Sequence, residues 1–447
     1  MHAKASPYSA IRKRPAEPRR RQPRASAASA GGSAGLIESG PRWMFLLYCG
    51  YFFVEFMRPQ DLLPALGAAK PGMLMALPLA AAWVIKGDKS VLGDRLVKLY
   101  IALLALTALS TLYAVNTFWP VSSAKTLTLY LLCAALPASF LLSDAFRLRR
   151  FFDLFLLINC GLSVYALTHA GRGPGSFLGD ENDLALCVNF AMPFAMYFAL
   201  LPGTPLRQRL LYGAATGLMI AAVVASGSRG GFVTTVAVLL GVVLLSKRPV
   251  RYLLVVGLVA GIAALSLPDQ YVSEMETISD TGDSTRQDRI WSWKMGYRMW
   301  QDNPWLGVGA GNYPWRVAEY EWQSPEFDPQ TMKLHAGRAA HSFYVSVLSE
   351  LGLVGSVLMT WLLWSMWRRQ RRCARAARDS QGDAELEFLD ALSRGLQVAL
   401  GAFLAGGLFL TVHFYPYPWV LVGWTLAVER VIRLRLRALG RSDEVFA

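Results

Sequence analysis

The sequence predicts an all-α polytopic membrane protein with about twelve transmembrane helices and one large loop that itself contains helices. Three observations support this fold class. Of the 447 residues, 54% are hydrophobic and only 17% are charged, whereas soluble domains carry roughly a quarter charged residues. The mean hydropathy is +0.32, and basic residues gather in short clusters between apolar runs rather than on one soluble face.

Apolar runs of roughly the twenty residues needed to cross a bilayer recur along the chain. They begin near Trp43, Pro71, Leu96, Ala124, Phe151, Leu184, Leu210, Gly231, Tyr252, Ser342, Gly395 and Pro416. Nine fall within residues 42–267 and three within residues 342–434. The first two are the weakest predictions, because Arg58, Asp61 and Lys70 shorten them.

The loops between these runs alternate in charge. Lys and Arg cluster in every second loop, at residues 86–98, 147–150, 207–209, 247–251, 368–378 and 430–441. The positive-inside rule assigns these loops to the cytoplasm. It explains the net charge of +14 better than nucleic-acid binding does, and it places both termini inside.

Two tails and one loop remain outside the spans. Residues 1–41 are rich in Arg, Pro, Ala and Ser, and we interpret them as a disordered basic cytoplasmic tail. Residues 435–447 form a second cytoplasmic tail. Residues 268–341 are too polar to cross a bilayer and form a large loop on the opposite, outer face, where we expect the chemistry.

The five cysteines include no CxxC pair, and none lies in the large loop. We therefore predict no disulfide framework, no metal site and no cofactor.

Three arginines on the outer face run against the charge rule and need another reason to be there. Arg229 lies in Ser226-Gly-Ser-Arg-Gly-Gly231, where amides, hydroxyls and the guanidinium can converge on a phosphate. The alternative is a tight turn whose arginine reaches lipid headgroups. Arg286 and Arg289 precede an amphipathic run in which Trp291 and Trp293 are expected to anchor at headgroup level, so that one of the two arginines can reach a pyrophosphate. The alternative is a pair of surface arginines balanced by Asp280, Asp283 and Asp288.

His341 lies where the large loop re-enters the membrane, and a neutral imidazole there can accept a proton from a hydroxyl. The alternative role is helix capping, and His335 and His413 are rivals for the base. Glu350 follows in the same predicted helix, and a buried carboxylate needs a partner, for which we expect one of the arginines. Gly307-Val-Gly-Ala-Gly311 lacks the third glycine and the preceding strand of a nucleotide loop, so we reject that interpretation.

Taken in order, these segments resemble the O-antigen ligase and polymerase family of bacterial envelope glycosyltransferases. The resemblance covers roughly residues 96–424. The segments that carry it are Gly175-Ser-Phe-Leu-Gly-Asp-Glu-Asn-Asp183, Ser226-Gly-Ser-Arg-Gly-Gly231, Arg289-Ile-Trp-Ser-Trp293, Asp302-Asn-Pro-Trp-Leu-Gly-Val-Gly309, His341-Ser-Phe-Tyr344 and Glu350-Leu-Gly352.

The family pattern has an arginine four residues before a tryptophan and fifteen before the proline of Asn-Pro, which Arg289, Trp293 and Pro304 match. Arg286 does not match and is a secondary candidate. The family's usual His-Asn is His341-Ser342 here, and its usual Pro-Asn is Glu181-Asn182. These two departures put the roles of Ser342 and Asn182 in question.

The resemblance implies a GT-C-like helix bundle in the bacterial inner membrane with its active site facing the periplasm. The donor would be a glycan on undecaprenyl pyrophosphate, the acceptor a sugar hydroxyl of lipid A-core, and membrane lipids the surroundings. Arg229, Arg289 and His341 would be catalytic, without a metal and with inversion. Arg286, Asn182, Trp293 and Glu350 would contact substrate.

Other functions stay open. A polymerase or a protein O-glycosylation ligase would share the arginine and histidine chemistry. A polysaccharide or lipid transporter would instead need basic residues through its helix interiors and internal repeats, which the sequence does not show.

Overall fold

The computed structural model describes residues 40–266, 284–330, 332–378, 382–441 and 446. Within these ranges every regular element is a helix and no strand occurs, which confirms the all-α prediction. The predicted tail 1–41 lies outside the described residues except for its last two positions. The described residues also exclude residues 268–283 of the large loop and residues 442–445 and 447 of the second tail.

The helices run in the following order and with the following bounds. They are α1 (Arg42–Met57), α2 (Pro59–Leu62), α3 (Pro64–Ala69), α4 (Pro71–Lys86), α5 (Arg95–Leu109), α6 (Phe118–Tyr130), α7 (Leu136–Leu141), α8 (Ala145–Thr168), α9 (Glu181–Ala199), α10 (Leu206–Ala225), α11 (Arg229–Leu245), α12 (Pro249–Ser266), α14 (Ser284–Asp302), α15 (Tyr313–Trp322), α16 (Phe343–Arg378), α17 (Ala384–Gly406) and α18 (Pro416–Ala438).

Seven of the described helical segments are long and apolar enough to cross a membrane. They are Ala65–Lys86, Arg95–Leu112, Phe118–Leu141, Ala145–Thr168, Leu206–Ala225, Phe343–Arg378 and Ala384–Gly406. The chain is therefore a polytopic membrane protein, as predicted, while the count of about twelve spans stays a prediction.

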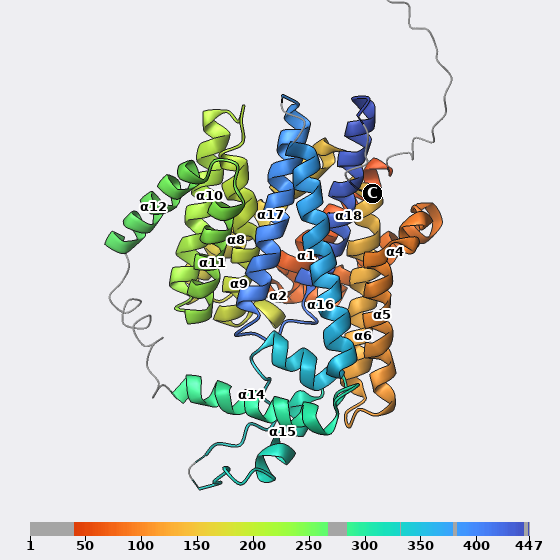
Figure 1. Cartoon of the computed structure of the whole chain (residues 1–447), viewed down its shortest axis with the longest axis vertical. Helices are drawn as coiled ribbons and strands as arrows, with labels where there is room; N and C mark the ends of the chain where they lie inside the picture. The colour runs from red at the N-terminus through yellow and green to blue at the C-terminus, as the bar shows by residue number, and fades with distance from the viewer. Residues whose placement is uncertain (1–39, 267–283, 331, 379–381, 442–445, 447) are drawn as a thin grey trace, which may run out of the picture. The chain divides into compact units, whose positions relative to one another are not determined.

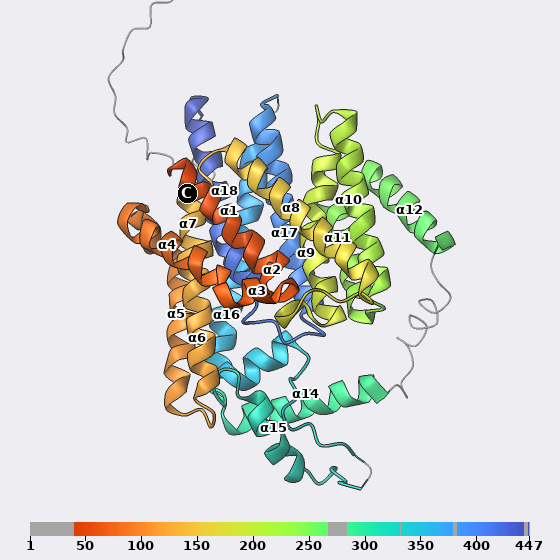
Figure 2. The ribbon, with the colours of Figure 1, turned by 180° about the vertical axis from the view of Figure 1, so that it is seen from behind.

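The basic loops lie together at one end of the helix bundle. The first turns of α8 and α10 and the last turns of α16 and α18 share that end, and α14 and α15 lie at the other (Figures 1 and 2). The residues at those helix ends are the clusters 147–150, 207–209, 368–378 and 430–441. Charge thus separates between the two ends of the bundle, the pattern that the positive-inside rule describes.

The first predicted span is short in the structure. α1 has 16 residues, about 24 Å at 1.5 Å per residue, against a hydrocarbon layer of about 30 Å. Arg58 ends α1 with a left-handed backbone, and Lys70 begins α4 with another. Between them lie the short helices α2 and α3, so the charged residues that weakened this prediction form the connection between α1 and α4.

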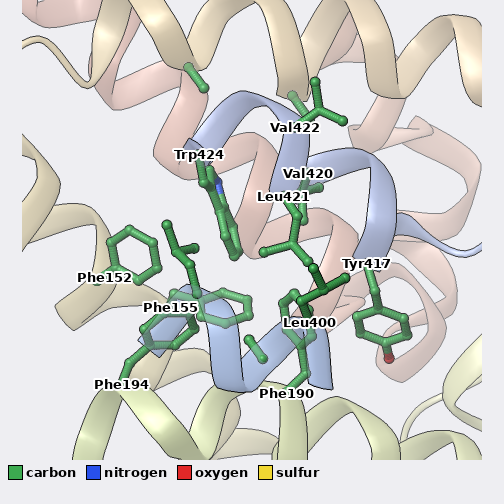
Figure 3. Packing of buried hydrophobic residues seen from close by; sticks show 14 of the residues in the cluster. Phe152, Phe155, Phe190, Phe194, Leu400, Tyr417, Val420, Leu421, Val422 and Trp424 are labelled. Carbon is green, nitrogen blue, oxygen red and sulfur yellow. The ribbon is translucent and has the colours of Figure 1, made fainter. Parts of the chain in front are cut away.

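An aromatic cluster holds the centre of the bundle together (Figure 3). The ring of Trp424 in α18 lies 5.1 Å from that of Phe152 and 5.2 Å from that of Phe155, both in α8. Phe194 of α9 lies 4.7 Å from Phe152. Lipid tails are as apolar as these rings, so the cluster stabilises the bundle through close packing rather than through exclusion of water. Edge-to-face pairs of this kind contribute roughly 0.5–1.5 kcal/mol each.

Helix α16 is broken at Gly352, whose φ of 63° and ψ of −162° are not helical. The break frees peptide groups that a continuous helix would pair, and the large loop supplies their partners. The amides of Val308 and Gly309 donate to the carbonyls of Ser349 and Glu350 at 2.8 and 3.0 Å.

The same loop pairs with α16 just beyond the break. The amides of Leu353 and Val354 donate to the carbonyls of Pro304 and Trp305 at 2.8 and 3.1 Å. We call these four hydrogen bonds, two on each side of Gly352, the helix splice. The glycine-rich segment 307–311 therefore has a structural task in the described chain, consistent with the rejection of a nucleotide loop.

Candidate active site

A cavity of about 340 Å³ lies where the large loop meets the bundle. Four segments line it: the start of α9, the first half of α14, residues 335–341, and the connection between α17 and α18. Its charged and titratable lining residues are Asp180, Asp183, Asp288, Arg289, Arg338, His335 and His341. Two of the predicted catalytic residues, Arg289 and His341, thus meet in one cavity.

The start of α9 is joined to the start of α11. Asp180 caps α9 by accepting a hydrogen bond from the Asn182 amide at 2.9 Å. The hydroxyl of Ser228 donates to Oδ1 of Asn182 at 2.6 Å, and it also caps α11 by accepting from the Gly231 amide at 2.8 Å. Asn182 lines the cavity, so this bond fixes the helix that begins with Arg229 directly behind the cavity wall.

Phe409 links the segments that carry the two predicted arginines. Its ring centroid lies 5.7 Å from the guanidinium carbon of Arg289, within cation–π range. A Cβ placed on Gly230 would lie 3.1 Å from the same ring. Arg289 and the residue after Arg229 therefore both lie against the Phe409 side chain. Arg229 itself is not among the described residues that line the cavity.

His341 lies at the cavity between two fixed points. The Trp293 indole donates to the Ala340 carbonyl at 3.1 Å, and the Phe343 amide donates to the Gly407 carbonyl at 2.7 Å. The His341 backbone is left-handed, with φ 49°. That conformation is uncommon outside glycine, although histidine adopts it more often than bulky residues do. The loop is thus held so that the imidazole faces the cavity.

The surroundings of His341 favour its neutral form. Desolvation in the cavity, and then the positive charge of Arg289, lower the pKa of His341 below its usual value near 6.5. Asp180 acts in the opposite direction, while Arg338 adds to the lowering. An imidazole in this state is able to accept a proton near neutral pH.

Ser342 replaces the family's asparagine with a residue of similar capping ability. Its hydroxyl accepts from the Val345 amide at 3.5 Å, and its carbonyl accepts from the Ser346 amide at 3.0 Å. Serine and asparagine are both good N-cap residues, so the substitution keeps the start of α16 in place.

The predicted pairing of Glu350 with an arginine is wrong. Glu350 is 2% exposed, and its Oε2 accepts from His413 Nε2 at 3.0 Å and from the Gly311 amide at 2.7 Å. Its Oε1 accepts from the Tyr313 amide at 3.4 Å. The carboxylate therefore ties the large loop to the connection between α17 and α18. His413, a rival for the base, has its Nε2 engaged there.

Other predicted residues have different positions. Arg286 is exposed in the first turn of α14, and it does not line the described cavity. The predicted headgroup anchor Trp291 is wrong, because its ring is buried and its indole donates to Glu321 at 2.9 Å. Trp293 does not line the cavity among the described residues either, but it holds the segment that leads into His341.

Within the described residues, no group of three or more His, Cys, Asp or Glu side chains is placed to hold a metal ion.

A second cavity of about 580 Å³ adjoins the first, and Ala339, Thr411 and Tyr415 line both. Its wall also includes Glu55, Arg58, Trp119 and Trp315, together with the Glu350–His413 pair. The two cavities therefore share part of one wall.

Sequence reasoning missed several residues of this region. Glu321, Phe409 and Thr411 lie in stretches where nothing in their spacing distinguishes them from ordinary surface or core positions. Asp288 appeared only as a charge partner for the nearby arginines, and its place in the cavity depends on the fold of residues 335–341.

The segment that contains Arg229, Arg289 and His341 carries the family signature. Residues 214–360 match the family model described as O-antigen ligase. The match confirms the resemblance to the O-antigen ligase and polymerase family. It begins in α10 and ends in α16, so it includes the helix splice and lies beyond Asn182. A comparison with curated proteins gave no match.

The match to the O-antigen ligase family model supports an enzyme of the ligase or polymerase type. Together with the membrane-spanning helices, it indicates a lipid-linked glycan and membrane lipids as partners.

Proposed function

We propose that the protein is an O-antigen ligase of the bacterial inner membrane. It transfers a glycan from undecaprenyl pyrophosphate to a sugar hydroxyl of lipid A-core at the periplasmic face. The observation that carries the proposal is the meeting of Arg289 and His341 in one cavity, at the end of the bundle opposite the basic loops.

In this proposal Arg289 and Arg229 bind the pyrophosphate. Arg229 is the first residue of α11, where the helix dipole also favours an anion. Phe409 and the Asn182–Ser228 bond keep the two arginine-bearing segments together. Charge that develops on the leaving pyrophosphate is then stabilised by cations already in place. Arg286, exposed nearby, is a secondary contact for the donor.

His341 acts as the general base. It takes the proton of the acceptor hydroxyl as that oxygen bonds to the anomeric carbon, while the bond from this carbon to the pyrophosphate oxygen breaks. Attack opposite the leaving group inverts the anomeric centre, and undecaprenyl pyrophosphate departs. The lowered pKa of His341 supports this role, because only the neutral ring accepts a proton.

The supporting residues hold this arrangement rather than react. Trp293 and Glu350 fix the segments around the cavity, and their contact with substrate stays a prediction. Asn182 lines the cavity and is able to contact substrate through its side chain.

A direct assay tests the proposal. The purified chain is incubated with an undecaprenyl-pyrophosphate glycan and lipid A-core in the presence of EDTA, and the mass of the core is followed. Transfer is expected to persist in EDTA, since the arginines supply the charge in this mechanism. Loss of transfer in EDTA that magnesium or manganese restores would contradict a metal-independent reaction.

Variants assign the roles. His341→Ala is expected to lose on the order of 100- to 10,000-fold in rate, the usual value of general-base catalysis. Arg289→Ala is expected to lose about 3 kcal/mol of transition-state stabilisation. Arg289→Lys should fail as well, because an ammonium cannot make a two-pronged contact. The matched control Arg316→Ala removes an arginine that pairs with Glu319 in α15, and it should keep wild-type rates.

The other functions give distinct results in the same assay. Elongation of the lipid-linked glycan without modification of the core would indicate a polymerase. Transfer to a serine or threonine of a protein would indicate a protein O-glycosylation ligase. Movement of the lipid-linked glycan across vesicles without any transfer would indicate a transporter.

A further inference from the structure

His335 is buried between the large loop and the cavity, and one side of its ring is tightly held. The side chain is 4% exposed. Its Nδ1 lies 2.6 Å from Oε1 of Glu321, and its backbone amide donates to Oε2 of the same carboxylate at 2.8 Å. Glu321 is fully buried and also accepts from the Trp291 indole at 2.9 Å.

These contacts define which ring nitrogen carries the proton. The Glu321 carboxylate already accepts from the His335 backbone amide and from the Trp291 indole, so it acts as an acceptor toward the ring as well. The Nδ1 of His335 is therefore the donor, and in the neutral ring Nε2 carries the lone pair.

The other nitrogen has no such partner. Nε2 of His335 is buried without a hydrogen bond in the described structure, although the residue lines the cavity. Its nearest charged neighbour is Oδ1 of Asp288 at 3.8 Å, beyond hydrogen-bond distance. Buried polar atoms are nearly always satisfied, so Nε2 offers a hydrogen-bonding position to a group that enters the cavity.

The charges at this end of the cavity disfavour an anion. Asp288 lies between His335 and Arg338, and its Oδ2 is 3.6 Å from the Arg338 guanidinium. Asp180 and Asp183 add two more carboxylates to the lining. A phosphate is better placed beside Arg289. A hydroxyl is uncharged, donates to the lone pair of Nε2, and also accepts from neighbouring donors.

We propose that His335 Nε2 marks a subsite for a hydroxyl of an uncharged sugar, held in place by Glu321. The proposal rests on the proposed function, which brings two sugars to the cavity: the acceptor sugar of lipid A-core and the first sugar of the donor glycan. Both present the same chemistry to His335, and binding measurements distinguish them.

Two variants separate the two sides of the ring. His335→Asn keeps an amide that is able to donate to Glu321 but removes the atom that reaches the cavity. His335→Gln places an amide near the position of Nε2 but gives up the contact with Glu321. Binding of lipid A-core and of the undecaprenyl-pyrophosphate glycan is measured separately on the full chain in lipid nanodiscs, without any transfer step.

We expect His335→Asn to weaken one of the two ligands by roughly tenfold, the typical value of one hydrogen bond to a sugar. His335→Gln should stay within about threefold of wild type if that hydrogen bond is the cause. Weaker lipid A-core binding assigns the subsite to the acceptor, and weaker donor binding assigns it to the first donor sugar.

Other results overturn the subsite. Unchanged binding of both ligands by His335→Asn would do so, as would binding lost only in His335→Gln, which would show that the histidine serves Glu321 alone. A wild-type chain that binds neither ligand also overturns it. A chain that binds both but transfers nothing would contradict the proposed function while leaving the subsite supported.

Discussion

Replacing Gly352 with alanine adds one methyl group at the break in α16. The residue has φ 63° and ψ −162°, a region that essentially only glycine occupies, so a side chain there costs of order 1–3 kcal/mol. The new Cβ would lie 2.4 Å from the Trp305 carbonyl oxygen and 2.6 Å from the Gly307 amide nitrogen. Both atoms belong to the backbone of the helix splice, and neither moves away cheaply.

The expected loss follows from these contacts. Relief of the clash separates the loop from α16 and removes the hydrogen bonds to the Pro304 and Trp305 carbonyls, each worth about 0.5–1.5 kcal/mol. Added to the backbone strain, this gives a loss in the free energy of unfolding of about 2–6 kcal/mol.

Variants at two other glycines separate the cost of the backbone conformation from the cost of the steric clash. Gly203 also has a left-handed backbone, with φ 74°, but nothing lies within 4 Å of its added Cβ. Gly203→Ala therefore carries only the backbone cost, about 1–2 kcal/mol. Gly401 lies inside α17 with open space around it, and Gly401→Ala should stabilise the helix by about 1 kcal/mol.

The assay heats each detergent-solubilised variant and follows the monodisperse fraction by size-exclusion chromatography. The midpoint temperature should be highest for Gly401→Ala, followed by wild type and then Gly203→Ala, and it should be lowest for Gly352→Ala. A Gly352→Ala midpoint equal to that of Gly203→Ala would refute the reasoning, because it would mean that the loop does not abut the break.

Two further predictions concern the cavity. Arg338 lowers the pKa of His341, so Arg338→Ala should raise that pKa and move the acidic limb of the kcat–pH profile to higher pH. Arg316→Ala should not move the limb. An acidic limb that stays in place or moves to lower pH in Arg338→Ala would contradict the assignment of His341 as the base. Trp293→Phe removes the indole bond that holds the segment before His341, so kcat should fall about 2- to 10-fold, whereas the lipid-side control Trp364→Phe should leave it unchanged. An unaltered kcat in Trp293→Phe would show that this bond does not position the base.

Hydropathy and charge predicted the membrane fold because both follow directly from solvation. A run such as residues 145–168 is stable in lipid whatever its neighbours are, and basic clusters avoid the outer face for reasons that also need no tertiary contact. The same reasoning predicted that Arg229, Arg289 and His341 share a face.

The break in α16 was not predictable in this way. Residues 342–360 are mostly apolar, so hydropathy predicts one continuous transmembrane helix. The break depends on segment 304–309, which lies some forty residues earlier and offers two carbonyls and two amides at the right spacing. A glycine in an apolar run gives little sign of such a partner.

The hydrogen-bond partners of buried polar and charged side chains could not be predicted from the sequence either. Glu350 pairs with His413 and Trp291 bonds Glu321, although each pair is far apart in sequence. A sequence shows that a buried carboxylate needs donors, but several candidates satisfy that need equally until the loop is folded.

The helix splice has a consequence for protein engineering. Residues 304–309 complete the backbone pairing of α16, so the large loop cannot be exchanged between related proteins as a separate module. A chimera that takes the loop from one protein and α16 from another would leave four peptide groups dependent on a matching register. The transferable unit runs at least from α14 through the first turns after Gly352, and it includes His335, His341 and Arg289 as one piece.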